Sequence, residues 1–316
     1  MKLSIIVPTY NEINHIENLI NSINNLDIDE KEIFIVDGGS NDGTVKKLIE
    51  LKEKYHNLYI VDNPDKYVSH GFNKAYSLTK GEYISLVGAH AFYPKNYFTK
   101  CIAEIELNSC DTAGGILKQT GIGLTGKAIA FAMSLKFGVG NTAFRTQKKR
   151  MYVDSVAFAV YKRSIFEKVG LLDQDLIRNQ DDEFHYRINA SGFKILMLPE
   201  LEVIYYVRES LWKLFSQYFQ YGFYKPLVLK KVSSAIKLRH VIPSFYIFYL
   251  FSLPICFKYI FWMIPLFCYI ISVLYFSFKT NTSAIIRLYM LTVFPVLHIA
   301  YGLGFILGLK LIFKKY

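Results

Sequence analysis

The chain is poor in cysteine throughout and lacks acidic residues toward its end. Its 316 residues include four cysteines, with no CxxC spacing and no partner histidines at zinc-finger distances. The sequence therefore supports neither a zinc knuckle nor a disulfide framework. From His240 onward Asp and Glu are absent. The composition is thus split between the two ends of the chain, and the split suggests two different environments.

The end without acid consists mostly of long apolar runs. Phe, Tyr, Ile, Leu and Val dominate three segments, residues 242–257, 259–278 and 285–309. Such runs approach the ~20 apolar residues that are needed to cross a bilayer. We predict a multi-pass protein of the cell membrane, with two to three spans in residues 241–316.

Basic residues precede the first apolar run and explain part of the net charge of +11: Lys225, Lys230, Lys231, Lys237 and Arg239. Basic residues beside a span favour the cytoplasmic side and anionic lipid headgroups. No known nucleic-acid motif accompanies this charge, so we expect no nucleic-acid partner. The first apolar run, residues 3–7, is too short for a signal peptide and is ended by Pro8. The catalytic part is predicted to face the cytoplasm.

The first part of the chain alternates strand and helix patterns. Strands are predicted at residues 3–7, 33–36, 58–61 and 83–87, and the pattern of 33–36 suits a strand buried on both faces. Helices are predicted between them, an amphipathic one at 13–23 and two more at 45–55 and 71–79. This order is typical of a doubly wound α/β sheet, whose strands point their carboxyl ends at one edge. Asp37 ends the second strand at that edge, where ligands bind. The alternative is that Asp37 and Asp42 only cap turns.

Four motifs at sensible spacing carry a family resemblance: SIIVPTYNE, IFIVDGGSNDGT, a strand that begins with GEY and leads into the three residues GAH, and NQDDEFHYR. Together they resemble family 2 glycosyltransferases, over residues 1–209. The resemblance implies the GT-A nucleotide-diphospho-sugar transferase fold, an α/β fold with a doubly wound mixed sheet. Within the family the chain most resembles membrane-attached polysaccharide enzymes of the succinoglycan-biosynthesis type. That likeness rests on the segments GAHAFYP, FGVGNTAFR, VDSVAF, RNQDDEFHYR and YGFYK.

The resemblance implies a nucleotide-sugar site at the strand edge. Residues that would bind the nucleotide sugar are Pro8, Thr9, Tyr10, Glu12, Asp37 and Gly88, with Asp37 receiving the base. Gly88 and His90 stand where the family has its aspartate-any-aspartate motif, whose last acid binds a divalent metal. We predict that His90 binds the metal, Mn²⁺ or Mg²⁺, with imidazole favouring manganese. The alternative for His90 is a hydrogen bond within its own loop.

The second cluster of carboxylates lies at residues 181–183. By resemblance Asp181 is the general base that takes the proton of the acceptor hydroxyl, which is a poor nucleophile without such help. Arg187, one helical turn after Glu183, is expected to offset the like-charge repulsion in the cluster. Further acceptor contacts are predicted at Asp182, Gln217, Gln220 and Tyr221. The alternative is that the acids only cap the amino end of a helix.

These observations predict three parts: a cytoplasmic glycosyltransferase domain (residues 1–209), an amphipathic and basic interface segment (210–240) and a transmembrane region (241–316). The predicted reaction is inverting transfer from a nucleotide sugar, expected to be a UDP-sugar, to a hydroxyl of a membrane-held, lipid-linked saccharide in surface polysaccharide synthesis. One alternative is a polyprenyl-phosphate glycosyltransferase. Another is a non-catalytic membrane scaffold that binds nucleotide sugar, because Gly88 lacks the family's acid.

Three further predictions concern local structure after the first four strands. Residues 120–128 are glycine-rich and are predicted to form a flexible loop rather than a phosphate-binding one. Residues 154–161 are predicted to form a strand. Residues 193–198 are predicted to form an edge strand that Pro199 ends, because proline has no N–H to donate.

Overall fold

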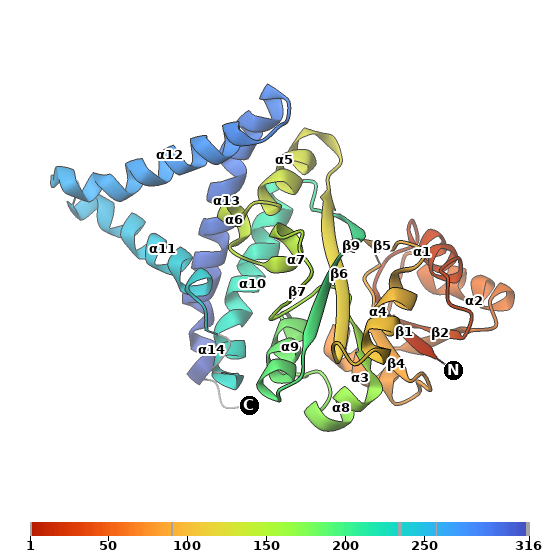
Figure 1. The fold of residues 1–316 in the computed structure, drawn as a ribbon. Helices are drawn as coiled ribbons and strands as arrows, with labels where there is room; N and C mark the ends of the chain where they lie inside the picture. Colours follow the sequence, from red (N-terminus) through yellow and green to blue (C-terminus); the bar gives the residue numbers. More distant parts are fainter. Residues whose placement is uncertain (1, 90, 233–235, 257, 314–316) are drawn as a thin grey trace. The chain divides into compact units, whose positions relative to one another are not determined.

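The computed structural model describes residues 2–89, 91–232, 236–256 and 258–313. It contains two compact units (Figure 1). The first unit comprises Met1–Lys118 and Gln147–Tyr205, and the second comprises Gln119–Thr146 and Tyr206–Tyr316.

The first unit consists of a mixed sheet with helices. Its strands are β1 (Leu3–Thr9), β2 (Lys31–Asp37), β3 (Leu58–Asp62), β4 (Tyr83–Leu86), β5 (Ala91–Phe92), β6 (Thr112–Thr120), β7 (Met151–Tyr152), β8 (Val160–Lys162) and β9 (Ile195–Tyr206). Its helices are α1 (Ile16–Asn24), α2 (Thr44–Lys54), α3 (Val68–Tyr76), α4 (Tyr97–Glu106), α8 (Arg163–Val169) and α9 (Gln180–Ala190). The predicted alternation of strand and helix over the first 90 residues is present.

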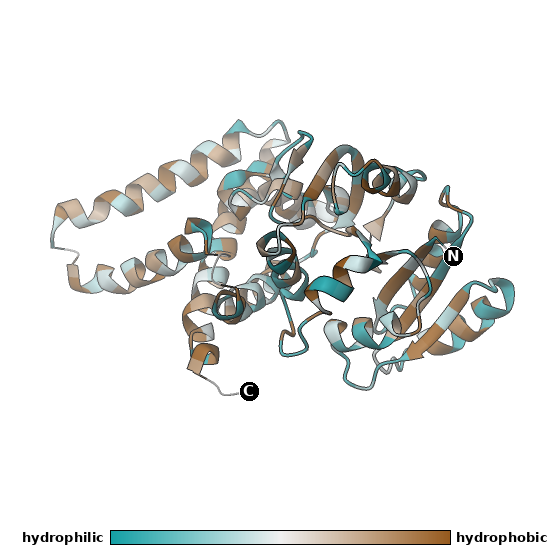
Figure 2. Ribbon diagram, turned by 60° about the horizontal axis from the view of Figure 1, so that its bottom comes forward, coloured by the Kyte–Doolittle hydropathy of each residue, from teal (hydrophilic) through white to brown (hydrophobic). Residues whose placement is uncertain are grey.

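The sheet has the order β3-β2-β1-β4-β8-β6-β9-β5, and β7 pairs with β9. Strands β1 to β4 are parallel to one another, whereas β8 runs antiparallel to both β4 and β6. Every residue of β2 is buried, which explains its continuous apolar run. Strands in Figure 2 are mostly brown, while the helices near the amino terminus carry both teal and brown.

Two local predictions about strands are wrong. The strand expected at 154–161 is reduced to β8, because Phe158 has a φ of 52° and interrupts the extended backbone. The edge strand expected at 193–198 is the longer, internal strand β9, which lies between β6 and β5. Pro199 lacks the backbone N–H that would donate a hydrogen bond, but the strand continues past it. Beyond Pro199, Leu201 and Val203 are buried on one face, at the two-residue spacing of a strand.

The second unit is helical. Its helices are α5 (Gly123–Met133), α6 (Lys136–Val139), α7 (Ala143–Thr146), α10 (Leu211–Lys231), α11 (Leu238–Cys256), the 3₁₀ turn η2 (Ile260–Met263), α12 (Ile264–Lys279), α13 (Ala284–Gly308) and α14 (Lys310–Phe313). The flexible loop predicted at 120–128 is therefore partly wrong, because α5 begins at Gly123. Gly121 lies against the backbone of Gly126, which turns the chain sharply into that helix.

Helices α10 and α13 pack with their backbones close together. A side chain at Gly304 would meet the carbonyl oxygen of Phe219, and one at Gly222 would meet that of Tyr301. Small residues permit such close approach between helices in or near a membrane. The aromatic segment that begins at Ser210 thus forms the start of α10, a long helix that packs against α13.

Within the described residues, three helical segments are long and apolar enough to cross a membrane: Leu238–Cys256, Ile260–Lys279 and Ala284–Phe313. Most of their side chains are not buried within the second unit, and large apolar residues such as Phe245, Phe251 and Phe267 are exposed. An apolar surface of this extent indicates association with a membrane. The predicted C-terminal membrane helices are confirmed in length and composition.

Candidate active site

The carboxyl ends of four parallel strands form the edge on which the candidate site is built. Thr9, the last residue of β1, lies beside Asp37 at the end of β2, and Asp37 lies beside Asp62 at the end of β3. On the other side of β1, the amide of Val87 donates to the carbonyl of Ile6 at 2.9 Å. Residues that follow these strands therefore meet at one edge of the sheet, as predicted.

Two loops at this edge are tied together. The loop after β1 and the loop after β2 exchange hydrogen bonds from Gly38 N to Thr9 O (2.9 Å), Asn11 N to Ser40 Oγ (2.8 Å) and Glu12 N to Thr44 Oγ1 (2.9 Å). Asn11 has a φ of 54°, a conformation that asparagine tolerates better than most residues. The connections hold the predicted nucleotide-binding residues of both loops in one rigid frame.

Asp37 is buried within this frame, and its carboxylate accepts three hydrogen bonds from its own loop. The donors are the amides of Gly39 (2.9 Å) and Ser40 (2.8 Å) and the hydroxyl of Ser40 (2.6 Å). Asp37 thus caps a turn, as the simpler interpretation of the sequence has it. A carboxylate can accept about four such bonds, so the capping role leaves capacity for one further donor.

Tyr10 and Lys66 lie beside Gly38, the residue that follows Asp37. The ring of Tyr10 is 51% exposed. The Nζ atom of Lys66 lies 5.9 Å from the centre of that ring. Lys66 was not predicted as a site residue. It follows β3 and reaches the site only because β3 pairs with β2, a long-range contact with no local signal in the sequence.

Of the other residues predicted to bind nucleotide, Pro8 is half-buried opposite Val36 in the ladder, and Thr9 is buried. Glu12 is half-buried, and its amide donates to Thr44. Gly88 follows β4 at the same edge. His90, the predicted metal ligand, lies outside the described residues.

Gly88 is covered by an aromatic ring. An ideal Cβ built on Gly88 would lie 2.9 Å from Cε1 of Phe158 and 3.2 Å from its Cζ. The amide of Gly88 donates to the hydroxyl of Tyr93 at 3.3 Å. Among the described residues no group of three or more His, Cys, Asp or Glu is placed to hold a metal ion. The described part of this loop thus does not by itself form a metal site.

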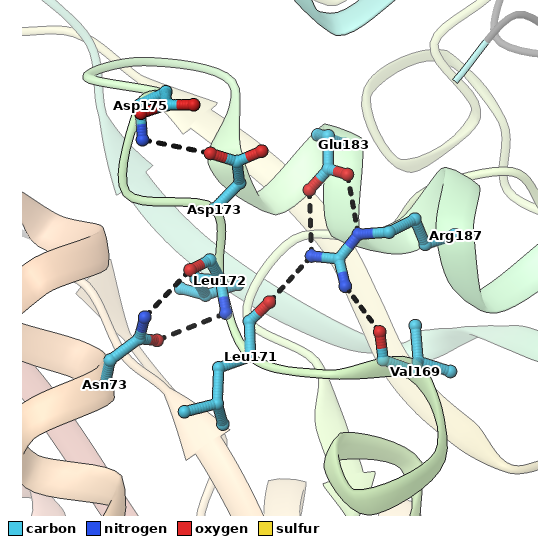
Figure 3. Close-up of polar contacts among 8 residues, drawn as sticks. All are labelled: Asn73, Val169, Leu171, Leu172, Asp173, Asp175, Glu183 and Arg187. Carbon is cyan, nitrogen blue, oxygen red and sulfur yellow. Dashed lines mark hydrogen bonds and ion pairs between the residues drawn. The ribbon is translucent and has the colours of Figure 1, made fainter. Parts of the chain in front are cut away.

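The second cluster of carboxylates begins helix α9. Asp181, Asp182 and Glu183 lie in its first turn, where negative charge interacts favourably with the helix dipole. Glu183 is buried and pairs with Arg187 through contacts of 2.6 and 2.9 Å. Figure 3 shows this pair together with the carbonyl oxygens that Arg187 also reaches. Arg187 therefore neutralises one of the three acids, as predicted.

The segment that leads into α9 is fastened to helix α3. The side chain of Asn73 donates to the carbonyl of Leu172 at 2.8 Å and accepts from its amide at 3.1 Å. Figure 3 shows both bonds on the loop that continues toward Asp173. Helix α3 itself contacts β1, β2 and β3. The start of the acidic helix is thereby linked to the strands that carry the nucleotide-binding loops.

His185, a buried residue of the same helix, contacts two further polar side chains. Tyr161 on β8 and Nε2 of His185 are 2.8 Å apart, and Nδ1 of His185 lies 3.3 Å from Ser155 Oγ. Burial lowers the pKa of His185 to about 4, so the imidazole is neutral near pH 7. Burial, and secondarily the charge of Asp181, raises the pKa of Tyr161 well above its ordinary value. Tyr161 belongs to β8, which pairs with β4.

The remaining predicted acceptor residues belong to the second unit. Gln217, Gln220 and Tyr221 lie on α10, where Nε2 of Gln217 donates to the hydroxyl of Tyr221 at 3.0 Å. All three are half-buried.

Comparison with known proteins identifies the family. The model of glycosyl transferase family 2 matches residues 4–170. The chain belongs to glycosyltransferase family 2. This family 2 glycosyltransferase is 31% identical over 221 residues to succinoglycan biosynthesis protein ExoA of Rhizobium meliloti, covering 69% of this chain and 67% of that protein.

A second relative is dolichyl N-acetyl-alpha-D-glucosaminyl phosphate 3-beta-D-2,3-diacetamido-2,3-dideoxy-beta-D-glucuronosyltransferase of Methanococcus voltae. It is 30% identical over 240 residues, covering 72% of this chain and 74% of that protein. Among solved structures, mannosyltransferase PcManGT of Pyrobaculum calidifontis, in complex with GDP-Man and Mn²⁺, matches with a TM-score of 0.64. The match has 17% identity and covers 92% of this chain and 85% of that one.

These matches confirm three predictions: the family, the GT-A fold and the glycosyltransferase activity. The protein is a family 2 glycosyltransferase related to enzymes of polysaccharide biosynthesis. The matched region contains both loops of the strand edge and Gly88, and it ends before Asp181.

Proposed function

We propose that the protein transfers a sugar, with inversion, from a nucleotide diphosphate sugar to a hydroxyl of a lipid-linked saccharide at the cytoplasmic face of a membrane. The observation that carries the donor assignment is the pair of tied loops at the ends of β1 and β2. These loops place the exposed ring of Tyr10 beside the Asp37 turn and Lys66. A planar base can stack on such a ring, and the cation of Lys66 suits a diphosphate.

Asp181 is proposed as the general base. In a single displacement, the acceptor oxygen forms a bond to the anomeric carbon while the bond from that carbon to the diphosphate oxygen breaks. The proton of the acceptor hydroxyl passes to the Asp181 carboxylate, and nucleoside diphosphate leaves. Attack from the opposite face inverts the anomeric configuration. Arg187 already pairs with Glu183, which leaves Asp181 and Asp182 as candidates for the base. We assign the base to Asp181 because it matches the family's general base, and we assign an acceptor contact to Asp182.

The acceptor assignment rests on the second unit. In the part of the chain that the structure describes, three helical segments are apolar enough to cross a membrane, and basic residues precede the first of them. An enzyme held at a membrane meets amphiphilic acceptors at high local concentration. We propose that Gln217, Gln220 and Tyr221 on α10 bind the saccharide part of such an acceptor. The domain scheme proposed from the sequence, with residues 1–209 catalytic and 210–240 at the interface, serves this function.

A divalent ion is proposed with His90 as its protein ligand and the donor diphosphate as its other ligand. The described residues near Gly88 supply no carboxylate cluster for an ion, so no step of the reaction is assigned to it. Removing metal with EDTA and adding back Mn²⁺ or Mg²⁺ tests this proposal directly. Activity that survives chelation, together with an active His90→Ala variant, would contradict it.

The reaction is tested with the full-length protein in detergent, UDP-sugars as donors and membrane lipid extracts as acceptors. We expect Asp181→Asn to lower the transfer rate by about 10²–10⁴-fold, the usual contribution of a general base, with donor affinity within twofold of wild type. Glu53→Gln, on the exposed side of α2, is the matched control and should be fully active.

The acceptor used distinguishes the alternatives. Transfer to polyprenyl phosphate but not to lipid-linked saccharides would favour a polyprenyl-phosphate glycosyltransferase. No turnover of UDP- or GDP-sugars with any extract, despite measurable binding, would favour a non-catalytic scaffold. Near-normal turnover of the Asp181→Asn variant would remove the assignment of the base.

A further inference from the structure

We propose that Phe158 forms the part of the donor pocket wall that contacts the sugar, and that it determines which donor sugars are accepted. This inference rests on the proposed function. Phe158 lies in the segment before β8, far from Gly88 in sequence. Its ring nevertheless occupies the space in which a side chain at position 88 would lie.

The contact between Phe158 and Gly88 is close. The distances of 2.9 and 3.2 Å from an ideal Cβ of Gly88 to two ring atoms are shorter than real Cβ atoms normally show. Even an alanine at position 88 would therefore require the ring to move. The space beside Gly88, just after β4, is thus filled by the ring of Phe158.

The backbone of Phe158 is held in an unusual conformation. Its φ of 52° lies in the left-handed region, where a bulky residue is an outlier. Such strain persists only where the surrounding structure enforces it, and it concentrates at functional sites. Contacts with two tyrosines hold Phe158 in this conformation. The hydroxyl of buried Tyr97 donates to the carbonyl of Phe158 at 2.9 Å. The ring of Tyr93 meets that of Phe158 edge-on at 5.5 Å.

The position and chemistry of the ring suit contact with a sugar. Phe158 and Gly88 are each only half-buried. They adjoin β4, whose neighbour β1 carries the proposed nucleotide-binding loop. A pyranose ring has faces of C–H groups that pack on aromatic carbon, whereas a carboxylate would bind hydroxyl groups. A wall made by Phe158 therefore favours donors whose sugar presents an apolar face at this point. It does not contribute to binding of the nucleoside diphosphate part of the donor.

A double-mutant cycle tests the contact itself. Gly88→Ala should lower the melting temperature of the full-length protein in detergent by several degrees. In the background of Phe158→Ala the same substitution should have little effect, because the ring that it would meet is gone. Equal effects of Gly88→Ala in both backgrounds would overturn the proposed packing.

Calorimetric binding tests the role. Each titration of the wild-type protein compares a nucleoside diphosphate with a sugar nucleotide that contains it. The pairs are UDP with UDP-glucose, UDP with UDP-N-acetylglucosamine, and GDP with GDP-mannose. The pair that binds most tightly is then used with the variants. Phe158→Ala should weaken the sugar nucleotide about tenfold and leave the free nucleoside diphosphate within twofold. Phe158→Leu should recover part of the loss. Tyr59→Ala, which removes a partly exposed ring stacked on Phe34 toward the other end of the strands, is the control.

The outcomes separate this inference from the proposed function. If the wild-type protein binds neither member of any pair, the proposed donor site is wrong and this role falls with it. If it binds them, and Phe158→Ala weakens both members equally or neither, the donor site stands. Phe158 then has no contact with the sugar.

Discussion

The guanidinium group of Arg187 joins the acidic helix to the end of the helix before it. Its Nε and Nη2 atoms lie 2.6 and 2.9 Å from the two carboxylate oxygens of Glu183. Its Nη1 atom donates to the carbonyl of Val169 and its Nη2 atom to that of Leu171, both at 2.7 Å. One side chain thus pairs with a buried charge and donates hydrogen bonds to two carbonyl oxygens at and just after the end of α8 (Figure 3).

Arg187→Ala should destabilise the first unit by about 3 kcal/mol, because it leaves the carboxylate of Glu183 buried without its partner. The quantity to measure is the free energy of unfolding of the full-length protein by denaturant in detergent. Arg150→Ala is the matched control. Arg150 also forms two contacts of 2.6 Å with one carboxylate, that of Glu104, but it is 50% exposed. Its loss should cost less than about 1 kcal/mol.

If Glu183→Gln in the Arg187→Ala background restored none of the lost stability, the buried charge would not be the cause. Equal losses for Arg187→Ala and Arg150→Ala would contradict the argument from burial as well.

Asn73→Ala should loosen the loop that leads into α9. The substitution removes both hydrogen bonds to Leu172 and should cost about 1–3 kcal/mol. The specific readout is hydrogen exchange of the Leu172 amide, which should become at least tenfold faster. Asn73→Asp keeps the acceptor for that amide and should protect it better than alanine does. Unchanged exchange in the alanine variant would show that the loop is held elsewhere.

His185 should make stability depend on pH. Its pKa is about 4 in the folded protein and about 6.5 when unfolded, so between these values the unfolded chain binds more protons. The free energy of unfolding should therefore rise with pH from about 4 to 6.5, and the contribution amounts to about 3 kcal/mol. His185→Gln should flatten this part of the curve relative to wild type. An identical slope in the variant would mean that carboxylates alone cause the acid sensitivity.

Gly304→Val should separate helices α10 and α13, because its side chain would meet the carbonyl oxygen of Phe219. Overpacking of this kind costs about 1–3 kcal/mol and lowers the melting temperature measured in detergent. Leu307→Ala, at an exposed position of the same helix, is the control and should change it little. A stable Gly304→Val variant would indicate that the two helices are free to move apart.

The sequence determined the kind of each element where the pattern is local. The alternation over the first 90 residues and the apolar end follow from periodicity and composition, which depend on neighbouring residues alone. Helix α4 was not predicted, yet Phe98, Ile102 and Ile105 are buried at helical spacing, so its signal was present. Family motifs added the expected roles of Asp37 and Asp181.

The tertiary structure alone decided which side chains meet. Nothing local in the sequence indicates that Phe158 covers Gly88 or that Lys66 lies over Tyr10. Such pairs depend on strand order and register, and a residue far along the chain enters a site only when its strand pairs there. For the same reason Pro199 does not end β9. The neighbouring strands and the buried face of Leu201 and Val203 outweigh one missing donor.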